Sequence, residues 1–239
     1  MNLSITHTEC KKHKRLSLLG FSAWRRRLGH GLMLLLLCLL CFEVIGNALP
    51  TPQTVSRYGP HAQQLFREWQ NLLNSLANGN DMQRLTGVNA FFNQRIIYSE
   101  NRDVWNKADY WATPLETFGK GAGDCKSFTI NKYVSLRLLG MAPEKLRLTY
   151  VKVMIGGPNS NVTEAHMVLA YYPTPAAEPL ILDNLVNSIK PASMRPDLIP
   201  VFSFNMEGIW VGTVQENNVG QLTRWKQLLD KLKAEGFSF

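Results

Sequence analysis

Three side chains are spaced so that they could form a hydrolytic site. Cys125 follows the glycine-rich run Gly119-Lys-Gly-Ala-Gly-Asp124, and the residues after it have helical spacing, so we expect the thiol at a loop-to-helix junction. The free amides and the dipole of a helix N-terminus favour a thiolate and can bind an oxyanion. His166 opens one strand-like run and Asp183 closes the next. This order predicts a nucleophile, a base and a residue that orients the base.

Each of these residues alone has a simpler explanation. A single cysteine is often a small buried side chain, and a histidine or an aspartate often belongs to the core or to a turn. The combination favours catalysis, because after Ala48 the chain has one cysteine, Cys125, and two histidines, His61 and His166.

The N-terminus has the pattern of an export signal. A basic stretch leads into the apolar block 31–42, and the small residues Gly46 and Ala48 follow. The block is shorter than the ~20 apolar residues of a spanning helix, so we predict a signal peptide over residues 1–48 and a periplasmic protein. The long basic stretch leaves an uncleaved inner-membrane anchor open. An exported cysteine without an internal partner is either paired between molecules or reactive, and a helix start favours the second for Cys125.

The positive charge of the chain is concentrated in this leader. The net charge is +8, but from Leu49 onward 19 Lys and Arg stand against 16 Asp and Glu, which leaves +3. A nucleic-acid partner therefore loses its main support. The length of 239 residues and the 45% hydrophobic content suit one well-buried domain.

Apolar residues recur at helical spacing in some segments and alternate, as in strands, in others. These segments are the elements that must position the site. Helices are expected at 65–76, at 82–92 behind Asp81 as N-cap, at 126–139 and at 222–232, and strands at 146–155, 165–172, 180–183, 201–204 and 209–211. A proline-containing loop joins strands 165–172 and 180–183, which predicts an antiparallel pair. Such a pair brings His166 and Asp183 to one edge of the sheet.

These elements predict a single α+β domain over residues 61–239. Residues 49–60 have prolines and a glycine without an apolar period, so we expect an extended entry segment there. N-terminal helices come first, and a central helix that begins at the nucleophile packs on an antiparallel sheet. This order resembles papain-like and transglutaminase-like folds.

Several segments between residues 90 and 212 resemble one family in order. They are Asp109-Tyr-Trp-Ala-Thr-Pro-Leu-Glu116, Gly119-Lys-Gly-Ala-Gly-Asp-Cys125, Ser135-Leu-Arg-Leu-Leu-Gly140, Ala165-His-Met-Val-Leu-Ala-Tyr-Tyr-Pro173, Leu182-Asp-Asn-Leu185, and the run from Arg195-Pro-Asp-Leu to Ser203-Phe-Asn205. With these residues the chain resembles the bacterial transglutaminase-like cysteine proteinases, and among them the periplasmic members that cleave a surface adhesin.

The resemblance implies a concrete function. Cys125 would be the nucleophile, His166 the base and Asp183 its orienting residue, in agreement with the assignment from spacing. The enzyme would cut a large adhesin near its N-terminus at an Ala-Ala pair, release it from the outer membrane and so promote biofilm dispersal. An inner-membrane receptor for cyclic-di-GMP would bind the protease and inhibit it.

The resemblance also implies calcium dependence, with acidic ligands in a run Asp-Cys-Glu-Asp around the cysteine. This chain has Asp124-Cys125-Lys126-Ser127, so an ammonium and a hydroxyl replace two carboxylates. Calcium takes several oxygen ligands and a lysine repels it. Asp124 is therefore the candidate calcium ligand, with a role as helix N-cap as the alternative. If the ion site is lost, Lys126 could supply the positive charge in its place.

Two other functions stay open from the sequence. The same three residues suit transglutaminase-like amide chemistry on another cell-envelope substrate, and a non-catalytic homologue could bind the receptor only. The intact triad opposes the second, whereas Lys126 and Ser127 leave room for it. The backbone N–H of Cys125 is the expected first oxyanion donor. The segment from Gly119 to Asp124 contains no glutamine that could serve as the second.

Overall fold

The computed structural model describes residues 47–156, 160–212, 214–216 and 222–239. The predicted signal peptide falls, except for its last two residues, outside the described residues. Ala48 lies against the C-terminus, where it exchanges two backbone hydrogen bonds of 2.9 and 3.1 Å with Ser238. In the part of the chain that is described, no helix is long and apolar enough to cross a membrane.

Helices and one large sheet make up the described fold, in the chain order that the periodicity predicts. The helices are α2 (Pro52–Ser56), α3 (Gly59–Leu76), α4 (Asp81–Arg95), α5 (Asn101–Trp105), α6 (Pro114–Lys120), α7 (Cys125–Leu138) and α8 (Thr223–Glu235). The strands are β1 (Ile97–Tyr98), β2 (Ala122–Gly123), β3 (Leu146–Met154), β4 (Thr163–Tyr171), β5 (Leu180–Leu182), β6 (Lys190–Pro191), β7 (Leu198–Phe204), β8 (Ile209–Val211) and β9 (Val214–Glu216).

The main sheet is antiparallel and has the order β6-β5-β4-β3-β7-β8-β9. β3 and β4 form its longest pair, with Leu146 opposite Tyr171 and Met154 opposite Thr163. β1 and β2 form a separate parallel pair. The predicted α+β class, with a central helix and an antiparallel sheet, is confirmed.

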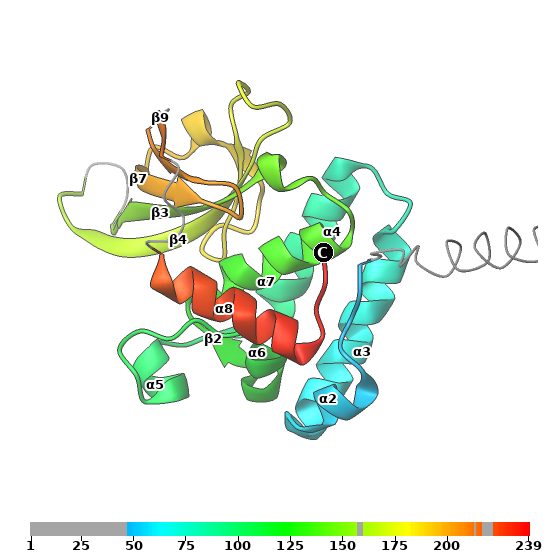
Figure 1. The fold of residues 1–239 in the computed structure, drawn as a ribbon. Coiled ribbons are helices and arrows are strands. Elements are labelled where there is room, and N and C mark those ends of the chain that lie inside the picture. Colours follow the sequence, from blue (N-terminus) through cyan, green and yellow to red (C-terminus); the bar gives the residue numbers. More distant parts are fainter. Residues whose placement is uncertain (1–46, 157–159, 213, 217–221) are drawn as a thin grey trace, which may run out of the picture. The chain divides into compact units, whose positions relative to one another are not determined.

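The central helix α7 lies between the sheet and the other helices (Figure 1). One side of α7 contacts β4, where the Thr129 hydroxyl donates a 2.9 Å hydrogen bond to the carbonyl of Met167. Another side contacts α4 and α6. Almost every residue of α7 is buried as a result, and the helix start is held from several directions.

Buried aromatic side chains fill the space between the helices. Trp69 of α3 is fully buried, donates a 2.8 Å hydrogen bond to the Ser135 hydroxyl of α7, and meets the Phe118 ring of α6 edge-on at 5.6 Å. Burial of a side chain of this size stabilises a fold by about 2 to 3 kcal/mol. The indole therefore fixes α3 and α6 against the helix that carries Cys125.

Two local predictions are wrong. The segment 49–60 is not extended throughout, because Thr51 caps the short helix α2 with a 3.2 Å hydrogen bond from Thr54 N–H, and α3 begins at Gly59. Proline suits the first turn of a helix, where its missing N–H costs nothing, so the prolines mark helix starts here. The N-cap of α4 is Asn80, which forms a capping box with Gln83, and not Asp81.

Candidate active site

The thiol of Cys125 lies at the first residue of α7, as predicted. Asp124 is the N-cap, and its side chain accepts a 3.0 Å hydrogen bond from the backbone N–H of Ser127. The cysteine residue is almost entirely buried, with 9% of its surface exposed. A helix N-terminus in this position supplies amides that can bind a negative charge at the sulfur or at an attacked carbonyl oxygen.

The glycine run before Cys125 is required by close packing. Gly121 has φ +64, and a Cβ there would lie 2.5 Å from the His61 ring. A Cβ on Gly123 would lie 2.5 Å from the Cβ of Ser127. Both contacts are too short for a side chain, so glycine lets the loop approach His61 of α3 at position 121 and the first turn of α7 at position 123.

His166 and Asp183 meet beside this helix start. β4 and β5 are antiparallel neighbours, with Leu169 opposite Leu182, so His166 in β4 lies near Asp183, the residue that directly follows β5. His166 Nε2 is 2.8 Å from Asp183 Oδ1, and both residues are buried. The Cys125 side chain interacts with the same imidazole, and because Nε2 is occupied by Asp183, Nδ1 is the ring nitrogen that remains for the thiol. The three predicted residues are therefore brought together at one site, with Asp183 hydrogen-bonded to His166 and Cys125 beside the imidazole.

The environment of His166 favours its charged form. Burial opposes the imidazolium, but the interactions with Asp183 and Cys125 outweigh burial and raise the pKa of His166 to about 9. A cation beside a cysteine stabilises its thiolate. His166 is thus an imidazolium at neutral pH, beside the Cys125 thiol.

Asp183 is itself held by residues that the sequence did not predict. Its Oδ2 accepts a 2.8 Å hydrogen bond from Arg195 Nη2, and its Oδ1 accepts one of 3.1 Å from the Leu185 N–H. Burial raises its pKa, but His166 and Arg195 more than compensate and lower the pKa of Asp183 to about 2. The carboxylate therefore stays ionised and fixed toward the histidine.

The backbone carbonyl of Asp183 is fixed as well. Lys132 Nζ of α7 donates to it at 3.0 Å and Asn93 Nδ2 of α4 donates at 2.8 Å. The Lys132 side chain is fully buried, and burial lowers its pKa to about 7. The sequence contains one indication that Lys132 lies near the site. Lys132 is seven residues after Cys125 and therefore on the same side of the helix.

Of the aromatic residues near Cys125, some are buried packing residues and others are exposed. Trp111 is buried against the rings of Phe204 and Trp225, with ring centroids at 5.8 and 6.5 Å, so it is a packing residue. Tyr98 of β1 is paired with Gly123, two residues before the cysteine, and is 48% exposed. The β1 segment, which periodicity did not mark as part of the site, is therefore the exposed surface beside the thiol.

The donor set around Asp124 does not fit a calcium ion. Oδ1 of Asp124 accepts hydrogen bonds from Ser127 and Oδ2 contacts the Lys126 ammonium, so both oxygens already have donors. Among the residues that the structure describes, no group of three or more His, Cys, Asp or Glu side chains is placed to hold a metal ion. Asp124 acts as N-cap, the alternative role that its position allowed.

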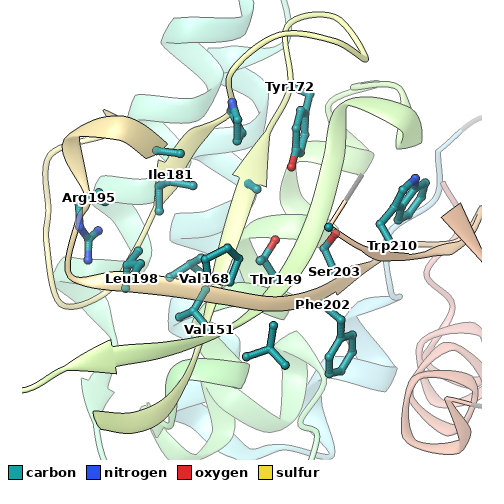
Figure 2. A pocket seen from close by; sticks show the side chains of 16 residues that line it. Thr149, Val151, Val168, Tyr172, Ile181, Arg195, Leu198, Phe202, Ser203 and Trp210 are labelled. Atoms are coloured by element: carbon teal, nitrogen blue, oxygen red, sulfur yellow. The ribbon is translucent and has the colours of Figure 1, made fainter. Parts of the chain in front are cut away.

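A separate cavity of about 310 Å³ lies on the main sheet and is bounded by β7 (Figure 2). Its apolar lining includes Val151, Val168 and Ile181, and Trp210 stands at one side. Arg195 also lines it and is the residue that connects it with Asp183. The cavity is separate from the predicted catalytic residues, because none of Cys125, His166 and Asp183 is among its described lining residues.

The chain matches one protein-family model and several solved structures. The model is that of the bacterial transglutaminase-like cysteine proteinases, and it matches residues 65–212. LapG of Legionella pneumophila is similar at 38% identity with a TM-score of 0.66, over 75% of this chain and 94% of that one. No match was found among curated proteins.

Two further structures of the same relative are a calcium-bound form and an EGTA-treated form. The calcium-bound form of Legionella pneumophila LapG is 38% identical with a TM-score of 0.65, over 75% of this chain and 96% of that one. The EGTA-treated form is 37% identical with a TM-score of 0.66, over 75% and 94%. Calcium thus binds to a protein similar to this chain.

Proposed function

The chain belongs to the bacterial transglutaminase-like cysteine proteinases, and from this we propose that it is a periplasmic cysteine endopeptidase that cuts a large surface adhesin. The observation that carries the proposal is the position of Cys125 at a helix N-terminus beside His166, whose Nε2 is hydrogen-bonded to Asp183. In this assignment Cys125 is the nucleophile, His166 the general base and acid, and Asp183 the orienting residue.

The reaction begins with attack of the Cys125 thiolate on the scissile carbonyl carbon. The carbonyl oxygen becomes an oxyanion, and the backbone N–H of Cys125 at the start of α7 is placed to donate to it. The His166 imidazolium then gives its Nδ1 proton to the leaving amine, and the C–N bond breaks. An acyl-enzyme remains on the sulfur.

Water completes the cycle. Neutral His166 removes a proton from a water molecule that attacks the thioester, and the thiolate leaves as the acid product forms. Asp183 holds Nε2–H throughout at 2.8 Å, and Arg195 keeps the carboxylate from turning away. The histidine can therefore exchange protons at Nδ1 while its ring stays in place.

The proposed substrate is the N-terminal region of a large adhesin, cut at an Ala-Ala pair, with biofilm dispersal as the result. The proposed inhibitory partner is the periplasmic domain of an inner-membrane cyclic-di-GMP receptor. The resemblance of residues 90–212 to adhesin-cleaving family members supports both.

Incubation of the purified protein with adhesin N-terminal fragments tests this function. We expect two products whose masses add to that of the fragment plus one water, and no cleavage of a matched fragment in which the Ala-Ala pair is replaced by Glu-Glu. The receptor's periplasmic domain should slow the reaction. Cleavage of both fragments would contradict the proposed specificity. Incorporation of an added amine in place of water would indicate transglutaminase-like chemistry.

A further inference from the structure

The carboxylate of Asp124 is satisfied entirely by groups of its own chain. Oδ1 accepts hydrogen bonds from the backbone N–H of Ser127 at 3.0 Å and from the Ser127 hydroxyl at 3.1 Å. Oδ2 contacts the ammonium of Lys126. Asp124 is only 3% exposed, so these partners replace water around a buried charge.

The charges around Lys126 are already balanced. Its Nζ lies 3.6 Å from Asp109 Oδ1, and Oδ2 of the same carboxylate lies 3.4 Å from Arg224 Nε. Two carboxylates, Asp124 and Asp109, therefore face two cations. The Lys126 side chain is 15% exposed, so its interaction with Asp124 is less screened than a surface ion pair.

A calcium ion at Asp124 would have to displace this arrangement. Calcium takes roughly six to eight oxygen ligands, and carboxylates are its main protein donors. At this position the two residues after Cys125 offer an ammonium and a hydroxyl. The ammonium would repel the ion at close range, and loss of the Ser127 hydrogen bonds would remove the cap of α7.

We propose that the Lys126 ammonium is a built-in cation that takes the place of a metal ion beside Cys125, so that the protein acts without calcium. Lys126 is a positioning residue in this account: it fixes Asp124, Asp124 caps α7, and the cap holds the Cys125 amide. Legionella pneumophila LapG, which has been solved in a calcium-bound form, would differ from this chain in the source of the positive charge. The claim that the protein is active without calcium rests on the proposed function, whereas the claim that Lys126 takes the place of the ion does not.

Calcium binding to the full chain is tested without any substrate. The protein is stripped with EGTA, and its melting temperature is measured with EGTA, with millimolar calcium and with millimolar magnesium, together with calorimetric titration of calcium. We expect the same melting temperature in all three and no binding heat. A rise of about 3 °C or more with calcium alone, which a well-occupied site would cause, would overturn the proposal.

Substitution of the two residues should create the missing site. Lys126→Glu together with Ser127→Asp adds two carboxylates beside Asp124 and removes the ammonium. We expect calcium to raise the melting temperature of this variant by about 5 °C or more, while EGTA returns it to the lower value. If the double variant folds and does not respond to calcium, Lys126 and Ser127 are not the groups that exclude the ion, and the proposal is wrong.

The role of the charge is tested by kinetics. Lys126→Met keeps the length of the side chain and loses the ammonium, Lys126→Arg keeps the charge, and Lys152→Met changes an exposed lysine on β3 as the matched control. We expect kcat to fall at least tenfold in Lys126→Met with KM little changed and no rescue by calcium, and near-normal kcat in the other two. Normal kcat in Lys126→Met would show that the charge is dispensable. If the wild type cleaves no adhesin fragment, the proposed function fails while the calcium measurements still decide the ion.

Discussion

The burial of Lys132 beside Asp183 can be tested through the pH dependence of stability. It is fully buried in α7, its ammonium donates to the carbonyl of Asp183 at 3.0 Å, and burial lowers its pKa from 10.5 to about 7. The folded protein therefore binds fewer protons than the unfolded chain between these two pH values. Its stability should rise with pH in that window, since stability increases wherever the unfolded state holds more protons.

Lys132→Met removes this titration and keeps a side chain of similar volume. Each pH unit inside the window changes the free energy of unfolding by up to about 1.4 kcal/mol for one proton. Between pH 7.5 and 9.5 the wild type should gain about 2 kcal/mol relative to the variant. At pH 7.5 the variant should be as stable as the wild type or more stable, because folding no longer requires a lysine that is charged in the unfolded chain to lose its proton and its water.

Urea unfolding of both proteins at a series of pH values measures the difference directly. Comparison with the variant cancels the contributions of other titrating groups. We also expect slower cleavage by Lys132→Met, because Asn93 alone then holds the Asp183 carbonyl. If the two stability curves run parallel from pH 7.5 to 9.5, Lys132 has an ordinary pKa and the reasoning about its burial is wrong.

Further predictions concern the same neighbourhood. Arg195→Leu removes one of the two cations that face the buried Asp183 carboxylate, leaving His166, and should lower the free energy of unfolding by about 3 kcal/mol, measured in urea. Cleavage should fall as the pH rises through about 9, where His166 loses its proton, and a rate maximum well above that value would contradict the raised pKa. Gly123→Ala should lower the melting temperature and the cleavage rate, because a Cβ would meet Ser127 at 2.5 Å. Intact-mass analysis of protein from the periplasm should give a chain that begins at Leu49, and a mass that retains residues 1–48 would indicate a membrane anchor.

Local patterns were sufficient for the main elements and for the three central residues. Strand alternation and the antiparallel loop placed His166 beside Asp183, because neighbouring strands in a hairpin bring the start of one next to the end of the other. The glycine run and the helical spacing after it placed Cys125 at the start of α7. The resemblance to one family then agreed with this assignment and added the substrate class.

The residues that hold Asp183 could not be predicted in the same way. Arg195 reaches it from a turn after β6, and Asn93 reaches it from α4, so these contacts depend on how distant segments pack. The spacing from Cys125 places Lys132 on the same side of α7, but a buried lysine looks like an exposed one in the sequence, and its burial results from the packing of α7 on several sides. The prolines of 49–60 were misleading because proline both interrupts and begins helices.

Detection of the acyl-enzyme tests the central claim most directly. The Asp183→Asn variant should deacylate slowly because His166 is poorly oriented, so the protein can be mixed with an adhesin N-terminal fragment, quenched in acid and analysed by mass spectrometry. We predict a mass gain equal to the N-terminal product less water, located on the peptide that contains Cys125, and no cleavage by Cys125→Ala. Product formation without this adduct, together with full activity of Cys125→Ala, would show that the thiol is not the nucleophile.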